Sequence, residues 1–158
     1  MKELQAPQPV IAGWREWVAF PELDLTRVKA KIDTGARTSA LHAFNIKRIQ
    51  HGDEDWVSFD TQPVQYATGP TLNCVARLKD IRVVTDSGGH REKRFVIETP
   101  MKMGKQEWMI ELTLTNRSKM KFRMLLGRHA MHMHGRLLVD PGKSFLTSRR
   151  RKTQKRTK

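Results

Sequence analysis

The sequence predicts an all-β domain with one short helix towards its C-terminal end. Short apolar runs alternate with turn-forming residues along most of the chain, and sustained helical periodicity is rare. Within the run Gln106–Leu114, single residues separate Trp108, Ile110 and Leu112, and this two-residue repeat is typical of a half-buried strand. Residues 149–158 contain no apolar side chain, so we expect a disordered basic tail there.

Each expected strand is a run of apolar, β-branched or aromatic residues bounded by turn formers. The expected strands are Trp14–Phe20, Arg27–Ile32, Leu41–Ile49, Trp56–Phe59, Cys74–Thr85, Phe95–Glu98, Gln106–Leu114 and Lys121–Leu126. Glycines place hairpin tips at His51–Asp53 and Ser87–His90, because glycine reaches positive φ without a steric cost. After Gly127, a short helix is expected over Arg128–His134.

One domain, residues 10–147, is expected between a flexible N-terminal segment (1–9) and the basic tail (148–158). A chain of 158 residues can bury a real core but is too short for two complete enzyme lobes. Cys74 is the single cysteine, which excludes an internal disulfide framework and a four-thiolate metal site. No stretch resembles a signal peptide or a membrane span, so we expect a cytoplasmic protein.

The chain is strongly basic, with 30 Lys and Arg against 16 Asp and Glu and a net charge of +14. The segment from Lys143 to Lys158 holds basic residues and no acidic one. Such a balance favours polyanionic partners, namely RNA, ribosomes or acidic peptides, and does not choose among them. The tail either docks on ribosomal RNA through phosphate contacts or is merely solvated.

The most informative short motif is Lys31–Ala36, in which an apolar strand runs into Asp33, Thr34 and Gly35. A carboxylate at a strand end can project into a cleft, and two such carboxylates brought together share one proton. The ionised member then acts as a base towards water, while the protonated member donates to a substrate carbonyl. The same tripeptide also suits an ordinary turn after a strand.

A second segment, Met124–Arg128, is an apolar strand that ends in Gly-Arg before the short helix. Together with the Asp33 loop it resembles the retropepsins. The longer stretch Ala30–Ala43 is similar to the RimK-associated retropepsin-like aspartic protease family (RimB), also described as ATP-dependent zinc proteases. Further similar stretches are Gly13–Val18, Phe20–Leu23, Leu112–Arg117 and Leu126–Arg128, and the resemblance covers about residues 10 to 147.

The resemblance implies a retropepsin-like closed barrel or sandwich in which each subunit supplies one Asp-Thr-Gly loop and one flap. Catalysis by so short a chain would need a C2 homodimer, with Asp33 facing Asp33 of the partner subunit. Thr34 and Gly35 would shape the loop, and Ala36, Gly127 and Arg128 would support it. The implied substrate is an oligoglutamate tail that the ligase RimK adds to a small-subunit ribosomal protein, and RimK itself is an expected partner.

The chain departs from the retropepsin pattern at Arg37, where these proteases carry an acidic residue that pairs with the Arg of the Gly-Arg turn. Arg37 and Arg128 would repel, so Arg128 needs another partner, for which Asp140 is a candidate. Arg37 either grips a substrate carboxylate through its planar guanidinium or makes a structural bond to a backbone carbonyl.

Asp86-Ser87-Gly88 repeats the Asp-hydroxyl-Gly pattern, which raises the possibility of an intrachain pair with Asp33. The spacing leaves no room for a second lobe. We therefore interpret Val83–Val96 as the flap hairpin, with Ser87, Gly88 and Gly89 at its tip against the substrate. A plain exposed hairpin is the alternative.

Neither zinc nor ATP is required by the residue patterns, so no cofactor is expected. His129, His132 and His134 are close in sequence, but the third points away from the face that the first two share on a helix, and no His-Glu-x-x-His occurs. Gly142–Ser144 matches only the end of a phosphate loop.

The function predicted is a dimeric aspartic peptidase. The alternatives are a catalytically weak adaptor that binds RNA or the ribosome, and a metallopeptidase.

Overall fold

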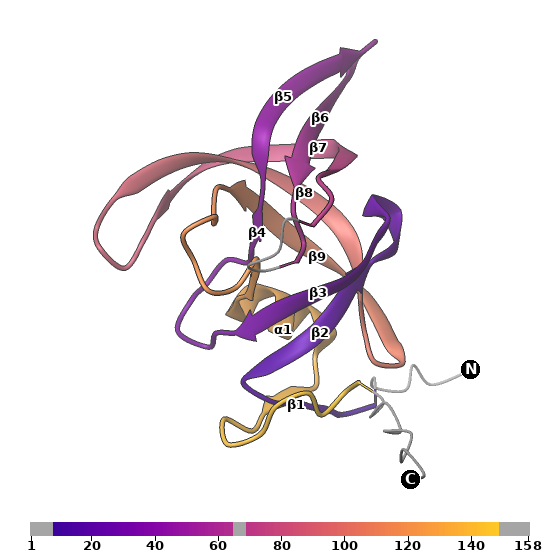
Figure 1. Cartoon of the computed structure of the whole chain (residues 1–158), viewed down its shortest axis with the longest axis vertical. Coiled ribbons are helices and arrows are strands. Elements are labelled where there is room, and N and C mark those ends of the chain that lie inside the picture. The colour runs from indigo at the N-terminus through magenta and orange to yellow at the C-terminus, as the bar shows by residue number, and fades with distance from the viewer. Residues whose placement is uncertain (1–7, 65–68, 149–158) are drawn as a thin grey trace, which may run out of the picture.

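The computed structural model describes residues 8–64 and 69–148 (Figure 1). Within them lie eleven strands and one α-helix. The strands are β1 (Val10–Ala12), β2 (Arg15–Phe20), β3 (Leu25–Ile32), β4 (Ala40–His42), β5 (Phe44–His51), β6 (Glu54–Thr61), β7 (Leu72–Thr85), β8 (Arg91–Met103), β9 (Gln106–Thr115), β10 (Met124–Leu126) and β11 (Leu137–Val139). The helix is α1 (Arg128–His134). The predictions for residues 1–7 and 149–158 lie outside the described residues.

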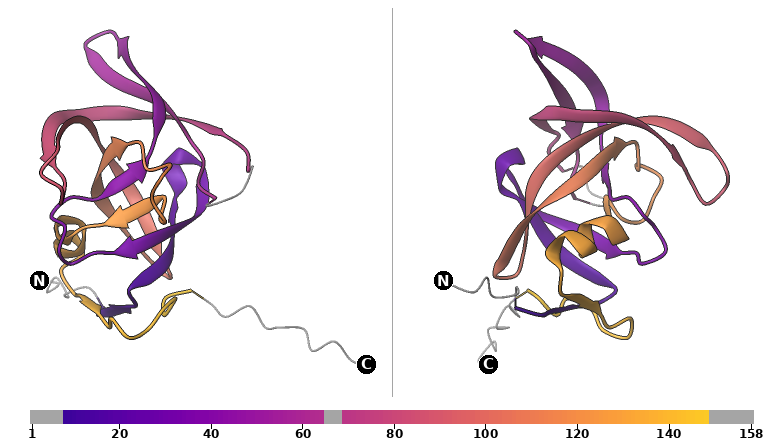
Figure 2. Two further views of the ribbon diagram at one scale, coloured as in Figure 1. Left: turned by 60° about the vertical axis from the view of Figure 1, so that its left-hand side comes forward. Right: turned by 180° about the vertical axis from the view of Figure 1, so that it is seen from behind.

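Six strands close into a barrel, which confirms the predicted all-β class. The sheet runs β2-β3-β10-β4-β9-β8, and a pairing of Ala19 with Lys102 joins β8 back to β2. Beyond β8 the sheet continues through β7 and β6 to β5. Figure 1 shows the β5–β6 hairpin standing away from the barrel at the top of the view and the β7–β8 hairpin arching out to the left. Figure 2 shows the latter hairpin from behind, reaching past the body of the molecule.

The barrel core comes from the alternating side chains that the sequence pattern predicts. Val18 and Val28 are buried on the paired strands β2 and β3, and Ile110, Leu112 and Leu114 are buried on β9. Burial of apolar surface stabilises the fold by about 25 cal/mol per Å². A one-residue slip would turn all of these side chains towards solvent, so the register is strongly specified. The strand register in turn fixes where β3 ends and the Asp33 loop begins.

Three predicted strand boundaries were wrong. The run Leu41–Ile49 is divided into β4 and β5 at Ala43, whose N–H donates to the carbonyl of Thr115 as the chain changes sheet partners. The run Lys121–Leu126 shortens to β10, and Phe95–Glu98 extends in both directions into β8. The parallel pair β1–β11 was not predicted, because it joins segments from opposite ends of the chain.

A buried carboxylate attaches the segment after β11 to the barrel. Glu16 is 0% exposed and accepts hydrogen bonds from the backbone N–H groups of Gly13, Leu146 and Thr147 at 2.8 to 2.9 Å. The Thr147 hydroxyl donates a further bond at 2.7 Å. Beside it, the ring of Phe145 stacks on Trp17 with a centroid separation of 5.7 Å. Glu16 therefore satisfies several donors at once in the interior.

Candidate active site

Asp33 follows directly on β3 and is held by its own loop. Its backbone N–H donates to the carbonyl of Leu126 on β10 at 2.9 Å. Its Oδ1 accepts hydrogen bonds from the N–H groups of Gly35 at 2.9 Å and Ala36 at 3.2 Å. Two backbone donors on one oxygen fix the orientation of the carboxylate.

The N-terminal end of α1 forms backbone hydrogen bonds with this loop. The N–H of Arg128 donates to the carbonyl of Ala36 at 2.8 Å, and the N–H of His129 donates to the carbonyl of Arg37 at 3.0 Å. These are N-terminal N–H groups of a helix, which have no partner within the helix itself. The loop carbonyls thus satisfy the helix end, and the helix end in turn fixes the loop.

Gly127 lies where the two segments touch. A Cβ at this position would lie 2.6 Å from the carbonyl oxygen of Thr38, so only glycine allows the close approach. The N–H of Gly127 also donates to the hydroxyl of Ser39 at 3.0 Å. The Gly-Arg turn predicted from sequence is therefore packed directly against the Asp33 loop.

Arg128 binds a backbone carbonyl in place of the expected carboxylate. Its Nη1 donates to the carbonyl oxygen of Thr34 at 2.8 Å, across 94 residues of sequence. The suggested partner Asp140 was wrong, because its Oδ1 accepts from the N–H of Gly142 in a local turn. Arg37 is exposed, and its side chain has no hydrogen bond or ion pair with any described residue. A structural bond from the Arg37 side chain to a backbone carbonyl is thus not formed within the described part of the chain.

The hairpin of β7 and β8 contains the predicted flap, Val83–Val96. At its tip, Oδ1 of Asp86 accepts from the N–H groups of Gly88 at 2.9 Å and His90 at 2.8 Å. The bond from His90 is the main cause of a lowered pKa of Asp86. Gly89 adopts a φ of 82°, which other residues rarely reach. Asp86 therefore builds the hairpin turn, which explains its Asp-Ser-Gly pattern without a second lobe.

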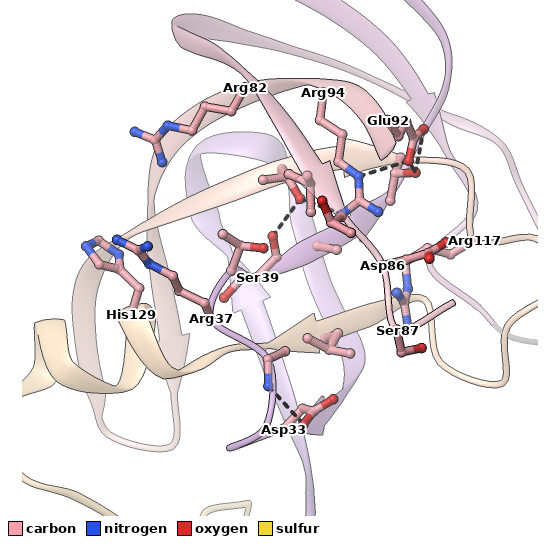
Figure 3. Close-up of a pocket in the computed structure, with 18 of the residues that line it drawn as sticks. Asp33, Arg37, Ser39, Arg82, Asp86, Ser87, Glu92, Arg94, Arg117 and His129 are labelled. Atoms are coloured by element: carbon pink, nitrogen blue, oxygen red, sulfur yellow. Dashed lines mark hydrogen bonds and ion pairs between the residues drawn. The ribbon is translucent and has the colours of Figure 1, made fainter. Parts of the chain in front are cut away.

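A cleft of about 1140 Å³ separates the Asp33 loop from this hairpin (Figure 3). Of the predicted site residues, those that line it are Asp33, Gly35, Ala36, Arg37 and Ser87. Those that do not line it are Thr34, Gly88, Gly89, Gly127 and Arg128. Figure 3 shows Arg37 and His129 on one side of the cleft and Arg117 with the flap residues on the other.

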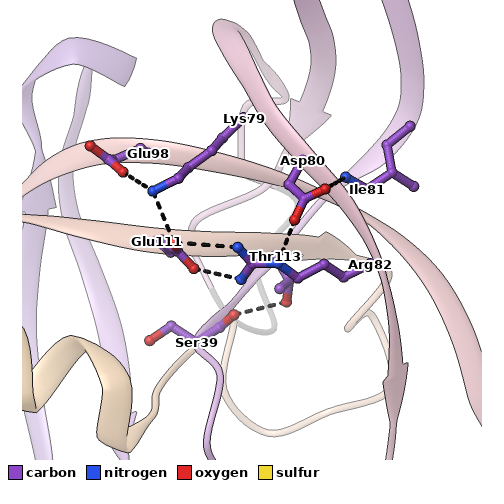
Figure 4. Close-up of polar contacts among 8 residues, drawn as sticks. All are labelled: Ser39, Lys79, Asp80, Ile81, Arg82, Glu98, Glu111 and Thr113. Carbon is purple, nitrogen blue, oxygen red and sulfur yellow. Dashed lines mark hydrogen bonds and ion pairs between the residues drawn. The ribbon is translucent and has the colours of Figure 1, made fainter.

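An ion-pair network joins the base of the β7–β8 hairpin to β9, and two of its members, Arg82 and Glu111, line the cleft (Figure 4). Glu111 on β9 binds Arg82 at 2.6 Å and Lys79 at 2.9 Å, and Lys79 also contacts Glu98. The hydrogen bond from Arg82 is the largest cause that lowers the pKa of Glu111 to about 2. Arg94 is paired likewise, with Glu92 at 2.9 Å. The arginines of the β7–β8 hairpin that line the cleft are thus neutralised by carboxylates.

The loop that precedes β10 contributes a basic residue to the cleft, Arg117, to which the sequence analysis assigned no role. Arg117, which lines the cleft, is only 8% exposed, and its Nε donates to the carbonyl of Phe122 at 3.0 Å. Its backbone N–H donates to Nδ1 of His42 at 2.8 Å. Burial, followed by the charges of Arg123 and Arg117, lowers the pKa of His42 to about 4. The imidazole is therefore neutral near pH 7 and carries its proton on Nε2.

The three histidines of α1 do not fit a zinc site. His134 is buried, where its Nε2 contacts Oε1 of Gln106 and its ring meets Trp108 edge-on. His129 lines the cleft, and His132 is exposed. Among the described residues, no three His, Cys, Asp or Glu side chains are grouped as metal ligands. The segment Gly142–Ser144 packs its backbone against Gly13 and Trp14, so it does not form a phosphate loop either.

A closed β barrel with one Asp-Thr-Gly loop, a flap hairpin and a Gly-Arg turn before a short helix defines a retropepsin-like domain. The particular family follows from comparison with known sequences. Residues 11–150 match the RimB-like family, described as "Retropepsin-like aspartic endopeptidase RimB". The chain belongs to this family.

Curated relatives are considerably longer than this chain. A protein of Desulfotalea psychrophila named "Probable alpha-L-glutamate ligase" is 47% identical over 131 residues, which are 83% of this chain and 28% of the relative. One of Shewanella pealeana with the same name is 46% identical over 135 residues, or 85% of this chain and 29% of the relative. The chain thus spans under a third of the length of these relatives.

A solved structure supports the fold. The crystal structure of a Legionella pneumophila protein of unknown function aligns with a TM-score of 0.74 at 28% identity, covering 89% of this chain and 100% of that one. In the described residues, no helix has the length and apolar character needed to cross a membrane.

Proposed function

We propose that the chain is a homodimeric aspartic peptidase in which Asp33 and Asp33 of the partner subunit activate water. The observation that carries this proposal is the Asp33 carboxylate, oriented by two backbone N–H groups on the wall of a cleft beneath a hairpin. Thr34 is exposed at the tip of the same loop, where it is accessible to a second subunit.

A second subunit is needed because the other carboxylates that line the cleft already have partners within the described residues. Asp86 is bound to the flap turn, Glu92 to Arg94 and Thr115, and Glu111 to Arg82 and Lys79. Among the described cleft residues, no other carboxylate is thus free to share a proton with Asp33. A two-fold axis through the Asp33 loop supplies one, because a C2 interface brings the same residue from both copies together.

The proposed chemistry uses the two carboxylates in different protonation states. At close range both cannot ionise readily, so they share one proton and titrate as a pair. The ionised carboxylate takes a proton from the attacking water, and the protonated one donates to the scissile carbonyl oxygen. The flap hairpin covers the substrate and excludes bulk water.

The proposed substrate is a glutamate-rich C-terminal tail of a small-subunit ribosomal protein. Relatives of this chain are named glutamate ligases and contain a matching segment within a longer protein, which associates this domain with glutamate addition. A peptidase that removes such tails would act on the product of a RimK-type ligase in the cytoplasm. Arg37, unpaired on the cleft wall, is suited to bind a substrate carboxylate.

The test is cleavage of a peptide that ends in several glutamates, followed by mass spectrometry in EDTA. The wild type is expected to shorten the peptide, and the Asp33→Asn variant is expected to leave it intact. A matched peptide that ends in glutamines measures the acidic preference, and Arg37→Ala should reduce cleavage of the glutamate peptide alone. Equal loss on both peptides would contradict a specificity role for Arg37. Activity that EDTA abolishes would contradict the aspartic mechanism.

A second candidate function is binding of RNA or the ribosome, favoured by the outer face of β2 and β3. Arg15 pairs with Lys31 in the strand register, and Trp17 pairs with Lys29. The Arg27 guanidinium lies 4.0 Å from the Trp17 ring centroid. Residues 149–158 lie outside the described residues and are rich in Lys and Arg. An RNA-binding adaptor should tolerate Asp33→Asn and lose RNA affinity when residues 149–158 are deleted, with a steep salt dependence.

A further inference from the structure

Of the four arginines that line the cleft within the described residues, Arg117 is the most deeply buried, with 8% of its surface exposed. Arg82 and Arg94, on the flap hairpin, each form an ion pair with a carboxylate. Arg117 forms no ion pair in the part of the chain that the structure describes. Because burying a cation without a counter-ion is costly, such a group on a cleft wall points to an anionic ligand.

The Arg117 side chain is held in place with one edge of its guanidinium free. Its Nε donates to the carbonyl of Phe122 at 3.0 Å, and the backbone N–H of the same residue donates to Nδ1 of His42 at 2.8 Å. The side chain makes no other hydrogen bond with the described residues, so Nη1 and Nη2 are unpaired there. Neither atom is among the unpaired side-chain nitrogens that the fold buries completely, so both keep access to solvent beside the cleft. Two free Nη atoms match both oxygens of one carboxylate.

Arg117 also lies near the candidate catalytic group. Burial lowers the pKa of Arg117, the positive charge of Arg94 lowers it further, and the negative charge of Asp33 acts in the opposite direction. Arg117 and Asp33 are therefore near enough to interact through charge. Figure 3 shows Arg117 next to the flap residues, on the side of the cleft opposite Arg37. A ligand carboxylate at Arg117 would thus belong to a substrate residue near the bond that the Asp33 pair cuts.

We propose that Arg117 is a specificity-determining residue that binds the side-chain carboxylate of a substrate glutamate next to the scissile bond. The proposal rests on the proposed function and adds to it the bond that is cut. In a C2 dimer, Arg117 of the partner subunit lies on the other side of the bound peptide, so both residues that flank the scissile bond meet a guanidinium. The preferred cleavage point is then between two glutamates. A bond between a neutral residue and the first glutamate of a tail is a poor substrate.

The guanidinium of Arg117 distinguishes a glutamate from a glutamine by charge and by hydrogen bonding. A carboxylate accepts from both Nη atoms and neutralises the cation, whereas a glutamine amide offers one oxygen and turns its own donors towards the second Nη. Hydrogen bonds to charged groups are strong enough that losing one lowers affinity about tenfold. Arg37 is exposed, so solvent screens its charge and its share of the preference is smaller.

The first experiment uses the wild-type protein, so no variant has to fold. Four peptides share a neutral sequence and differ at two adjacent positions, which hold Glu-Glu, Glu-Gln, Gln-Glu or Gln-Gln. Mass spectrometry identifies the bond that is cut and gives kcat/KM for each peptide. The Glu-Glu bond is expected to be cut fastest, and replacement of either glutamate is expected to lower kcat/KM about tenfold. Equal values for Glu-Glu and either mixed peptide would overturn the proposal.

The second experiment assigns the preference to Arg117. Arg117→Met removes the charge, and Arg77→Met is the matched control, because Arg77 has a side chain 68% exposed and does not line the cleft. The ratio of kcat/KM for Glu-Glu to that for Gln-Gln is expected to fall by about tenfold or more in Arg117→Met and to keep the wild-type value in Arg77→Met. If circular dichroism shows that Arg117→Met does not fold, Arg117→Lys takes its place, because an ammonium group cannot bind both carboxylate oxygens as a planar fork does and the ratio must fall there too. An unchanged ratio in the folded Arg117 variant would refute the assignment.

Failure of the proposed function has a different signature. Binding of the Glu-Glu and Gln-Gln peptides is measured by calorimetry in the Asp33→Asn background, where no cleavage is needed. If the wild type cuts neither peptide, but Asp33→Asn binds Glu-Glu more tightly and a further Arg117→Met substitution removes that difference, the peptidase is refuted and the carboxylate site at Arg117 stands. If Asp33→Asn binds both peptides equally, the site at Arg117 is refuted whether or not the wild type cleaves.

Discussion

The negative charge of Glu111 is expected to stabilise the base of the flap hairpin. Its removal should lower the free energy of unfolding by an amount that depends on pH. The carboxylate bridges Arg82 and Lys79 on β7 from its position on β9 (Figure 4). Replacing it as Glu111→Gln keeps the side-chain volume and removes the charge. Its neighbour Glu98, whose side chain forms an ion pair with Lys79 alone among the described residues, provides the matched control as Glu98→Gln.

The magnitude follows from the pKa of Glu111, which falls from 4.5 to about 2 in the folded protein. At about 1.4 kcal/mol for each unit of pKa difference, the full effect is about 3 kcal/mol. The side chains of Lys79 and Arg82 are 41% and 37% exposed, so solvent screens part of the attraction. We therefore expect a cost of about 1 to 2 kcal/mol for Glu111→Gln and below about 0.5 kcal/mol for Glu98→Gln.

The pKa of Glu111 is depressed by folding, so its contribution is fully present above pH 4.5 and is lost as the pH falls towards 2. Urea unfolding at several pH values should show the difference between wild type and Glu111→Gln shrinking across this window. A high salt concentration should reduce the difference at pH 7 as well. A difference that stays constant from pH 7 to pH 2.5 would refute the electrostatic account and indicate a packing role.

Three further predictions concern the groups that position the site. Gly127→Ala forces a Cβ to within 2.6 Å of the Thr38 carbonyl, so urea unfolding should show a loss of about 1 to 3 kcal/mol, with lost peptidase activity. Glu16→Gln turns a donor towards backbone N–H groups and should cost about 1 to 3 kcal/mol by the same assay. The pKa of His42 is lowered to about 4, so stability is lost as the pH falls from 6.5 to 4, and NMR should detect a neutral ring at pH 5.5.

Local sequence patterns predicted the all-β class well, because alternation reports directly which side chains face the core, whereas the closed barrel was expected only from the family resemblance. The buried positions Ile110 and Leu112 follow from a two-residue period that any half-buried strand shows. The boundaries failed where pairing between distant segments decides the structure. At Ala43 the chain leaves β9 for β6, and no residue signals the exchange. The pairing of β1 with β11 depends in the same way on where the two segments meet.

The candidate site likewise combines local features that the sequence predicts with long-range contacts that it does not predict. The Asp33 loop and the flap tip are local turns whose Asp and Gly residues can be recognised in sequence. The partner of Arg128 could not be predicted, since a backbone carbonyl carries no sequence signal, and the expectation of Asp140 was wrong. The position of Arg117 on the cleft wall could not be predicted either, because it depends on how the loop before β10 packs against distant segments.

The central claim is that one Asp33 from each of two subunits forms the catalytic pair, and a mixing experiment tests it most directly. Wild-type protein and Asp33→Asn are combined in equal amounts, subunit exchange is verified by native mass spectrometry, and cleavage of the glutamate peptide is measured at constant total protein. If every active dimer needs both carboxylates, activity follows the square of the wild-type fraction and falls to roughly one quarter. Activity of roughly one half, as for subunits that act independently, would contradict the shared site.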